Sequence, residues 1–469
     1  METDVLVIGT GAAGMAAALS ALESSRGEIR VLILEKTGEE AWGGNTRYTT
    51  ANMRLLDESK LLPSVEEDFK EFTKGKADWA HVKVILSRAS ETIAWLKSKG
   101  VEFESRPSNW PGYNLPRIGP VGGGLAVIST LRKHVEVMGG RVLFKTTAWK
   151  LSLDGQGRVD GVWVRDSSGR VQRIGAKAVI LACGGFEGNY EMLVRYLGRE
   201  AVNLRMDNPA TPLHMGECIN MALEVGAKTS GDFGGWHGSL HDTRSKAYRP
   251  MVHLYPFGVL VNKMGKRFVN EAFTDVSDSF EVIARSVFEQ PDHVAFVILD
   301  RKVTLVPGYQ KAVKTDHPPI TASTLEELAE KLGVNKEGFL RTVKEFNAAV
   351  QPEFNAAVQP GTFNPNVLDG KGTKGVEPPK SNWALPIDEP PFIAYPVECT
   401  VQFTYGGLAT DENARVLATN DSPIPGLYAA GEMVGLYYHR YVGGTSVLRA
   451  LIFGRIAGAN AVDYTRSLR

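Results

Sequence analysis

The chain has 469 residues, of which 43% are apolar, and its 53 Lys and Arg residues balance 53 Asp and Glu residues. Because this length exceeds what one compact core usually takes, we expect two domains, and the zero net charge provides no general attraction for nucleic acid or an anionic membrane surface. The three cysteines are far apart and form no CxxC pair, which argues against a disulfide framework, a zinc site, an iron–sulfur cluster or covalent haem.

The sequence contains no recognisable targeting or membrane segment. The apolar run DVLVIG begins close to Met1, which leaves no room for the charged and apolar regions of a signal peptide. No apolar stretch reaches the roughly 18 residues that a membrane-spanning helix needs. We therefore expect a cytoplasmic protein without a membrane anchor of its own.

The first motif lies in DVLVIGTGAAGMAAALSALESS, where a short apolar strand leads into a helix of small residues. Gly9, Gly11 and Gly14 form a GxGxxG fingerprint, which provides a tight turn, close approach of a pyrophosphate to the backbone, and close packing of helix on strand. The next strand, RVLILE, ends in Glu35, near the position where a carboxylate accepts a hydrogen bond from a ribose hydroxyl. This pattern predicts a dinucleotide site without separating NAD from FAD.

Three later stretches favour a flavin. EAWGGNTRYTTANMR places Gly43, Gly44, Asn45 and Thr46 shortly after Glu35, and this second turn of backbone donors suits a ribityl phosphate and the edge of a flavin ring. An ordinary nicotinamide domain does not need it. AKAVILACGGFEG and GLYAAGEMVG are buried strands that end in small residues, which allow a cofactor to lie against the sheet.

The middle of the chain differs in pattern from both ends. From about Asp232 the chain becomes loop-rich, then continues with AFVILD and the helical TLEELAEKLG and KEGFLRTVKEFNAAV, and the sheet pattern resumes near Ala394. We therefore predict a cofactor domain made of residues 1–231 and 356–469, interrupted by a capping domain at 232–355.

An internal duplication occurs at the second junction. The octet EFNAAVQP occurs twice without a gap, at residues 345–352 and 353–360. One duplication does not make a repeat protein. Because the proline that ends each copy limits a helix, we expect the second copy to lengthen a surface connection.

The last helix follows a polar cluster. His439, Arg440 and Tyr441 precede two glycines, and the helix is predicted to begin near Thr445 and Ser446. A helix start offers free N–H donors and partial positive charge, so this turn is a candidate site.

The motifs VIGTGAAG, GGNT, MALEVGA, GVLVNKMGKRFVNE, TYGGLATDENARVL, GLYAAGEM and GGTSVLRALIFGRIAG occur in this order over nearly the whole chain. Their series resembles the flavoprotein family of fumarate reductase and succinate dehydrogenase, which includes 3-ketosteroid Δ1-dehydrogenase and tricarballylate dehydrogenase. GGNTRYTTANMR and YYHRYVGGTS look most like the tricarballylate branch. The resemblance implies an α/β fold, with a Rossmann-like FAD-binding domain of the glutathione reductase type interrupted by a smaller α+β capping domain.

The resemblance also implies how FAD is held. In the family the last helix points at the N1/C2=O edge of the flavin, where charge accumulates when hydride reaches N5. Succinate dehydrogenases attach FAD through a histidine after the ribose-binding acid, but the first histidine here is His81, so we expect non-covalent FAD and no metal. The predicted cofactor-binding residues are Gly9, Gly11, Ala12, Ala13, Gly14, Glu35, Lys36, Gly43, Gly44, Asn45, Thr46, Ala148, Ala182, Cys183, Gly184, Gly431, Glu432, Gly444, Ser446 and Val447.

A histidine matches the substrate site of the family. In GDFGGWHGS, His237 corresponds to a substrate-binding histidine of fumarate reductases, with Gly238 and Ser239 in place of the usual Pro and Thr. His214 and His253 match no site motif, so we leave them out of the predicted site.

Departures from the reductase pattern favour dehydrogenation. Where reductases carry a Thr-Thr-Arg-Asp segment whose arginine delivers the proton, this chain reads AFTDVSDS, with Asp275 near that position. The reductase His-His-Thr becomes Gln402, Phe403 and Thr404. Tyr441 stands opposite the last reductase arginine, and steroid dehydrogenases also have a tyrosine there.

We predict an FAD-dependent dehydrogenase that introduces a C=C bond next to a carboxylate or carbonyl, by proton abstraction and hydride transfer to N5. A tricarballylate-like polycarboxylate is the leading substrate. Tyr441, activated by Arg440 or His439, is the first candidate for the base, and Asp275 is the second. The predicted catalytic residues are Tyr441, Arg440, His439 and Asp275, and the predicted substrate-binding residues are His237, Thr404, Arg47 and Arg54.

Other functions stay open. One is a desaturase of a ketone such as a 3-ketosteroid or of a secondary metabolite, or an ene-reductase. Another, of a different class, is a flavin electron-transfer or redox-sensing subunit, which would not need a polar pocket under a cap. The chain has no haem motif, cluster cysteines or second dinucleotide fingerprint, so we expect a separate iron–sulfur or quinone-linked electron acceptor, as the resemblance to tricarballylate dehydrogenases implies.

Overall fold

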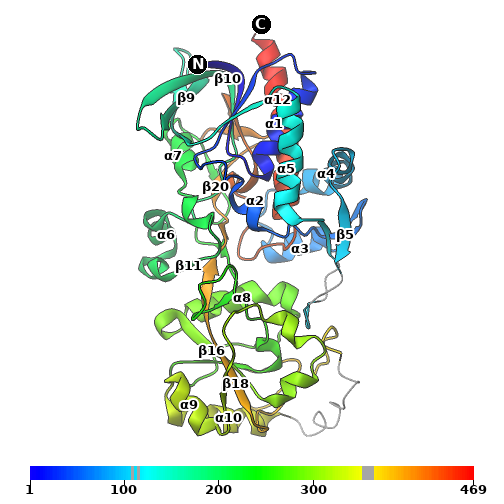
Figure 1. Ribbon diagram of the computed structural model, residues 1–469, viewed down its shortest axis with the longest axis vertical. Coiled ribbons are helices and arrows are strands. Elements are labelled where there is room, and N and C mark those ends of the chain that lie inside the picture. Colours follow the sequence, from blue (N-terminus) through cyan, green and yellow to red (C-terminus); the bar gives the residue numbers. More distant parts are fainter. Residues whose placement is uncertain (107–109, 114–116, 351–363, 469) are drawn as a thin grey trace.

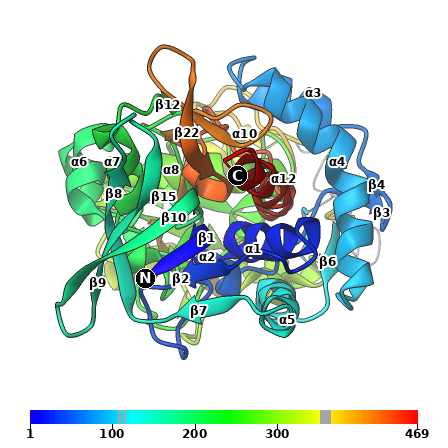
Figure 2. The same cartoon turned by 90° about the horizontal axis from the view of Figure 1, so that it is seen from above.

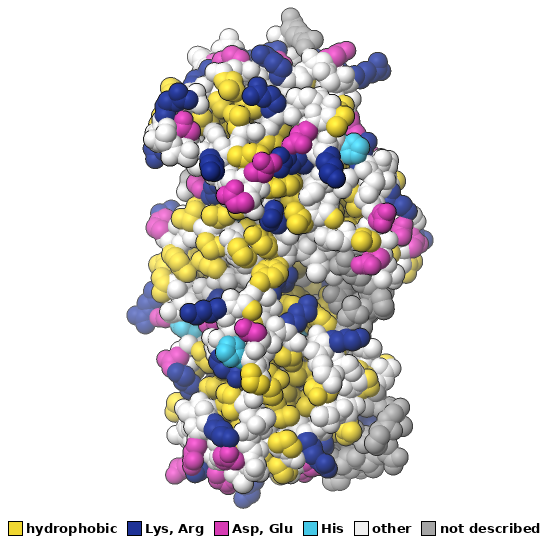
Figure 3. All heavy atoms as spheres, viewed as in Figure 1, with side chains coloured by type: hydrophobic (Ala, Val, Ile, Leu, Met, Phe, Trp, Pro, Cys, Tyr) yellow, Lys and Arg dark blue, Asp and Glu magenta, His cyan; other side chains and the backbone are white. Residues whose placement is uncertain are grey.

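The computed structural model describes residues 1–106, 110–113, 117–350 and 364–468. The main sheets lie in two lobes stacked along the long axis, and both chain ends lie in the same lobe (Figure 1). Basic and acidic side chains are interspersed over the face drawn in Figure 3, in line with their equal numbers in the sequence.

The lobe that contains the chain ends is built on the larger sheet. In the described part of the chain this sheet has eight strands, with the path β21-β22-β10-β1-β2-β7 and a β8–β9 meander beside β10. The strands from β22 to β7 are parallel. The bounds are β1 (Glu2–Ile8), β2 (Val31–Leu34), β7 (Arg141–Leu143), β8 (Thr146–Leu153), β9 (Val159–Asp166), β10 (Val171–Leu181), β21 (Arg415–Leu417) and β22 (Pro423–Ala429).

Alternate side chains of β1 belong to the cores on the two faces of this sheet. Val5 and Val7 join the core on the side of helices α1 (Ala12–Ser24), α5 (Gly123–Val137) and α12 (Ser446–Ser467) (Figure 2), whereas Leu6 and Ile8 join the core on the other side. Successive side chains of a strand point to opposite faces, so the continuous apolar run of β1 is buried on both sides of the sheet.

The first and last helices, α1 (Ala12–Ser24) and α12 (Ser446–Ser467), pack along each other. A Cβ added at Gly454 or Gly458 would lie 2.4 Å or 2.2 Å from a backbone oxygen of α1. Since α1 is rich in alanine, small residues on both helices permit this close approach. The chain ends therefore stabilise one another next to the first glycine turn.

The other lobe contains a smaller sheet, which has six strands in the described residues. Its central strand, β18, pairs with β16, β14, β17 and β11. The bounds are β11 (Arg205–Met206), β14 (Leu240–Asp242), β15 (Val259–Asn262), β16 (Val294–Leu299), β17 (Ile320–Ala322) and β18 (Phe392–Val401). Helices α9 (Leu325–Leu332) and α10 (Lys336–Ala349) pack on one face of this sheet.

This lobe corresponds to the predicted capping domain, whose division from the cofactor domain we keep as a proposal. The boundary at 355/356 and the second copy of the octet lie outside the described residues. β18 pairs with β14 and β16 of the middle segment, so we propose that the chain returns to the cofactor domain after Val401.

Two chain segments run side by side at the junction of the lobes. The short strands β13 (Trp236–His237) and β19 (Phe403–Thr404) pair in antiparallel fashion, so that His237 lies opposite Phe403. This pairing places two residues that are far apart in sequence at the junction of the lobes.

The remaining elements complete the surface. In the described residues the other α-helices are α2 (Gly44–Tyr48), α3 (Val65–Phe72), α4 (Trp79–Ser98), α5 (Gly123–Val137), α6 (Tyr190–Leu197), α7 (Glu217–Glu224) and α8 (Val276–Phe288), and the other strands are β3 (Leu55–Asp57), β4 (Lys60–Leu61), β5 (Phe103–Arg106), β6 (Arg117–Pro120), β12 (Thr229–Ser230) and β20 (Gly407–Leu408). Within the described ranges, none of the helices has the length and apolar character that crossing a membrane requires.

The cysteines correct one expectation. We expected no disulfide, but Cys183 and Cys218 are disulfide-bonded, and Cys399 is buried and free. The separation in sequence concealed this pair because β10 and α7 bring the two residues together in space.

Candidate active site

A cavity of about 870 Å³ runs between the two lobes. Its wall includes Gly11, Glu35 and Ser446 from the larger lobe, and Arg249 and Phe280 from the smaller one. A cavity of this size suits a cofactor together with a small substrate.

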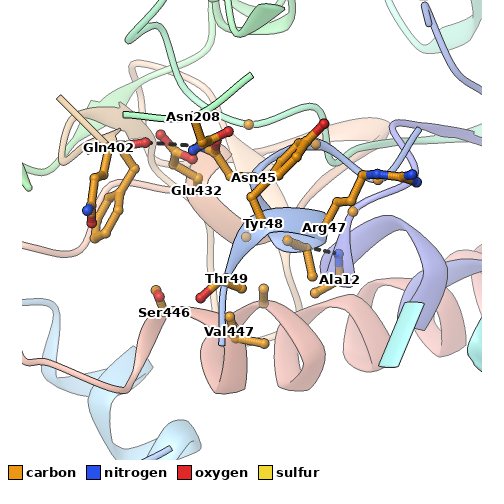
Figure 4. A pocket seen from close by; sticks show the side chains of 18 of the residues that line it. Ala12, Asn45, Arg47, Tyr48, Thr49, Asn208, Gln402, Glu432, Ser446 and Val447 are labelled. Carbon is orange, nitrogen blue, oxygen red and sulfur yellow. Dashed lines mark hydrogen bonds between the residues drawn. The ribbon is translucent and has the colours of Figure 1, made fainter. Parts of the chain in front are cut away.

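One end of the cavity is built around the first glycine turn. Gly9 has a φ of +108°, and a Cβ there would lie 2.3 Å from the carbonyl oxygen of Ala182. Helix α1 begins at Ala12 directly behind the turn, and its N-terminal N–H groups offer an anion site. The N–H of Ala12 donates to Thr46 Oγ1 at 3.1 Å (Figure 4), which ties the two predicted glycine loops together.

Glu35 lies where the fingerprint predicts it. Its carboxylate is buried and accepts hydrogen bonds from the Thr10 hydroxyl and from the N–H and hydroxyl of Thr37, the last two at 2.8 and 2.9 Å. Among the described residues, every predicted cofactor residue except Gly14 lines the cavity. A Cβ at Gly14 would lie 2.0 Å from Gly9 O, so Gly14 acts in the packing of helix on strand.

Asn45 joins the second glycine turn to both lobes. Its amide donates to Glu187 Oε1 at 2.7 Å and to Gln402 O at 3.0 Å, and its carbonyl accepts from Asn208 at 3.0 Å. Figure 4 shows Asn45, Asn208 and Gln402 converging on one side of the cavity, opposite Ser446 and Val447 of α12.

Glu187, His214 and Glu432 lie close together, with Glu187 and His214 buried and Glu432 half-buried, and their possible ligand atoms lie within 4.8 Å of one another. Burial raises the pKa of Glu187 to about 7 and raises the pKa of Glu432 well above its ordinary value. Burial also lowers the pKa of His214. The carboxyl groups therefore tend to hold protons and donate hydrogen bonds. That the site needs no metal stays a prediction, because these three groups offer metal-ligand atoms.

His237 occupies the junction of the lobes and is oriented by a carboxylate. Its Nδ1 lies 2.6 Å from Glu281 Oε2, and both side chains are buried. Burial opposes the charge of Glu281, but the Arg285 guanidinium and the bond with His237 hold the pKa of Glu281 below its ordinary value. An ionised Glu281 fixes Nδ1 as the protonated ring nitrogen and leaves the lone pair on Nε2.

Aromatic rings surround His237. The centroid of its ring lies 4.7 Å from that of Tyr441, 4.9 Å from that of Phe403 and 5.2 Å from that of Phe280. All four residues line the cavity. The histidine therefore faces the cavity from within a predominantly apolar wall.

The hydroxyl of Tyr441 lies at the start of α12. It accepts hydrogen bonds from the N–H groups of Thr445 at 3.1 Å and Ser446 at 3.0 Å, and donates to Ser446 Oγ at 2.9 Å. The predicted start of the last helix is confirmed, since α12 begins at Ser446.

The FAD binding domain family matches residues 4–447 of the chain. The chain belongs to this family of flavoproteins. NADH:fumarate oxidoreductase of Klebsiella pneumoniae is 29% identical over 483 residues, which cover 99% of this chain and 48% of that protein. The chain thus spans about half the length of that relative.

Solved structures of flavoproteins show the same fold. A flavocytochrome c3 fumarate reductase in an open conformation has a TM-score of 0.74 at 27% identity, covering 99% of this chain and 78% of that chain. 3-Ketosteroid-delta4-(5alpha)-dehydrogenase of Rhodococcus jostii RHA1 has a TM-score of 0.72 at 25% identity, covering 98% of this chain and 97% of that chain. The predicted fold class, family and FAD cofactor are confirmed.

The observed cradle fits FAD. The bare backbone at Gly9 and Gly11, the start of α1 and the buried Glu35 suit a pyrophosphate and a ribose. The loop at Gly43 and the start of α12 line the rest of the same cavity.

Several residues predicted to be catalytic lie elsewhere. Within the described structure, Arg440, His439 and Asp275 do not line the main cavity. Arg440 lies 3.8 Å above the Phe72 ring, donates to Asp278 O and lines a small second cavity together with His237 and Tyr441. Its predicted role beside Tyr441 therefore stays a proposal. The backbone carbonyl of His439 accepts from Arg285.

Asp275 caps a helix. Its carboxylate accepts hydrogen bonds from the N–H of Asp278 and the hydroxyl of Ser277 at the start of α8. Its sequence position opposite the reductase arginine does not bring it to the cavity because capping holds the side chain against the helix.

The predicted substrate residues fall into two groups. His237, Arg47 and Arg54 line the cavity, whereas Thr404, within the described structure, does not. Thr404 is buried and accepts a hydrogen bond from Phe186 N. Arg54 lines the cavity but is held by Asp68, Asp278 and the carbonyl of Gly443, so its guanidinium is already occupied.

Our sequence reasoning missed part of the cavity wall. His214 and His253, which we left out, both line the cavity. Other lining residues that we did not predict include Trp110, Tyr113, Asp207 and Asn208, and, from the predicted capping segment, Ser239, Tyr248, Arg249, Met251, Phe280 and Lys314. They come from separate loops and carry no motif, so the sequence offered no local signal for them.

Proposed function

We propose that the chain is an FAD-dependent dehydrogenase that forms a C=C bond next to a carboxylate or carbonyl. The observation that carries the proposal is the His237–Glu281 pair, which lies in the cavity wall beside Tyr441. A buried histidine oriented by a carboxylate is a general base with a defined tautomer.

The reaction removes a proton and a hydride from neighbouring carbons. FAD, when bound, supplies the acceptor for the hydride. His237 Nε2 takes the proton from the carbon next to the carboxylate or carbonyl, and Glu281 stabilises the imidazolium that results. Its aromatic neighbours exclude water, which strengthens these interactions. We thus propose His237 as the base, in place of Tyr441 or Asp275.

The position of Asp275 favours dehydrogenation over the reduction of a double bond. Asp275 lies near the sequence position of the arginine that delivers a proton in fumarate reductases, and its carboxylate caps α8. This position therefore does not provide a cationic acid for the reduction of a double bond.

The substrate carries a carboxylate or a ketone. A polycarboxylate such as tricarballylate was our leading expectation, but Arg54 is held by protein groups, which leaves Arg47 as its main support among the predicted arginines. A ketone is the second candidate, because the Tyr441 hydroxyl accepts from two N–H groups at the start of α12 and can turn its proton from Ser446 Oγ to a substrate carbonyl.

We further propose that electrons leave through a separate acceptor. The chain spans about half of the NADH:fumarate oxidoreductase it resembles, and its sequence shows one dinucleotide fingerprint. Peroxide formed in amounts equal to the product, with oxygen as the only acceptor, would instead identify an oxidase.

Anaerobic mixing tests the function. Oxidised holoenzyme is mixed with saturated acids and ketones, and the flavin absorbance is followed. We expect at least one compound to bleach the flavin and to yield an equal amount of its unsaturated product. A set of acids and ketones that all leave the flavin oxidised would favour the electron-transfer subunit.

A further inference from the structure

Two chain segments of the cap form a short ladder beside the cavity. His253 N donates to Ala312 O at 2.8 Å, and Lys314 N donates to Met251 O at 2.9 Å. Side chains alternate along such a ladder, and Met251, His253 and Lys314 all line the cavity. The ladder therefore presents a basic side chain, Lys314, on the cavity side.

Arg249 precedes this ladder and has an unusual environment. Its Nε is buried and, among the described residues, has no hydrogen-bond partner. Its φ is +50° although it is not glycine, a conformation that bulky side chains rarely adopt. Arg249 lines the cavity, where an anion can pair with the outer nitrogens of its guanidinium, since Nε itself is buried.

The carboxylate of Asp207, which lies beside Arg249, has other partners as well. Asp207 Oδ2 lies 3.5 Å from Arg249 Nε, and Asp207 Oδ1 accepts a hydrogen bond from Gln402 at 2.8 Å. His241 lies 3.3 Å from the same carboxylate. Asp207 therefore orients Arg249, but it does not form a hydrogen bond with Nε. The guanidinium can still pair with a second carboxylate.

A chain of rings leads from Lys314 to His237. Trp110 stacks on His253 with centroids 4.8 Å apart, His253 meets Phe280 at 5.9 Å, and Phe280 meets His237 at 5.2 Å. Lys314 Nζ lies 5.3 Å from the Trp110 ring. The wall is thus cationic at one end, apolar along its length and basic at His237.

We propose that Arg249 binds the carboxylate of a substrate whose body is an aromatic or alicyclic ring that lies along these rings. This inference rests on the proposed function, since it names the substrate class of the same site. A polycarboxylate fits less well, because carboxylates placed along the apolar wall would lose hydration without gaining partners.

Equilibrium binding to the oxidised holoenzyme tests the proposal without turnover. Benzoate, the neutral isostere benzamide and tricarballylate are titrated while the flavin difference spectrum is recorded. We expect benzoate to bind more tightly than either of the others. Arg249→Met should weaken benzoate binding by roughly 10- to 100-fold, as expected for the loss of a charge-assisted hydrogen bond, and should leave benzamide binding within about twofold.

Two further variants keep the test independent of folding. Arg249→Lys should recover part of the benzoate affinity because it restores the charge without the planar fork. Lys246→Met removes an exposed charge from the same loop and should change nothing. All variants should retain FAD.

The possible outcomes are distinct. Benzoate binding that is absent or does not depend on Arg249, or tricarballylate binding that is tighter than benzoate binding, would overturn the inference. If the proposed function alone is wrong, benzoate will still bind through Arg249 while no acid bleaches the flavin. If the inference alone is wrong, acids will bleach the flavin of the native enzyme and of Arg249→Met equally.

Discussion

The two halves of the cavity are lined by different kinds of chemical groups. Around Gly9, Gly43 and the start of α12 the wall consists of backbone and small side chains, whereas the cap contributes large rings and basic groups such as Phe280 and Arg249. A cofactor held by many backbone groups loses little when one side chain changes. A substrate held by a few side chains depends on each of them, so substrate choice can change while the flavin site stays the same.

The largest effect should come from a substitution in the half of the cavity that is built from backbone and small side chains. Gly9→Ala places a Cβ 2.3 Å from Ala182 O at a φ of +108°, so the turn must move and FAD affinity should fall by roughly 100-fold or more. Flavin retained after gel filtration measures this. Gly155→Ala, where a Cβ meets nothing within 4 Å, is the control. Normal flavin content in Gly9→Ala would mean that this turn tolerates movement.

The next effect should come from the His237–Glu281 pair. His237→Asn should keep FAD but lower kcat by about 10²–10⁴, because it removes the base. Glu281→Gln should lower kcat by about 10-fold to 100-fold and alter its pH profile, because the tautomer and charge partner of His237 change. A native rate of flavin bleaching in His237→Asn would exclude His237 as the base.

These predictions also mark what the sequence could reveal. Gly9, Glu35 and Asn45 were predictable because each belongs to a short local pattern whose geometry is fixed by one turn. His237 and Tyr441 were found through motifs at the junction of the lobes. Arg249 and Lys314 were not predictable, since they reach the cavity only through pairing of the 251–253 and 312–314 segments.

The same logic applies to residues that the motifs singled out but that lie beside the main cavity. Arg440 and Asp275 stand in site motifs, but Arg440 packs on Phe72 and Asp275 caps α8, and among the described residues neither lines the main cavity. The disulfide between Cys183 and Cys218 depends on the packing of distant elements. A sequence motif identifies a candidate residue, but the packing of neighbouring residues determines where its side chain lies.

A smaller effect should separate Tyr441 from Arg440. Tyr441→Phe leaves the N–H groups of Thr445 and Ser446 without their hydroxyl acceptor and should lower kcat by about tenfold with FAD retained. Arg440→Lys should change KM by less than about twofold, because Arg440 packs on Phe72 outside the main cavity. A tenfold rise in KM for Arg440→Lys would show that this arginine reaches the substrate.

The smallest effect concerns stability and pH. Burial raises the pKa of Glu187 to about 7 in the folded chain from 4.5, so the folded state binds the extra proton between these values. Stability should therefore fall as pH rises through this window, with a slope of up to about 1.4 kcal/mol per pH unit. Glu187→Gln should flatten the slope in urea unfolding at saturating FAD. An unchanged slope would mean that Glu187 holds no extra proton in the folded state.

The direction of the reaction is the central claim, and paired half-reactions test it most directly. Under anaerobic conditions, oxidised enzyme is mixed with a saturated ring carboxylate, and chemically reduced enzyme is mixed with the corresponding unsaturated acid. Our account predicts that flavin bleaching by the saturated acid is the faster process and that it slows by about 10²–10⁴ in His237→Asn. Faster reoxidation of the reduced flavin by the unsaturated acid, with no dependence on His237, would contradict it.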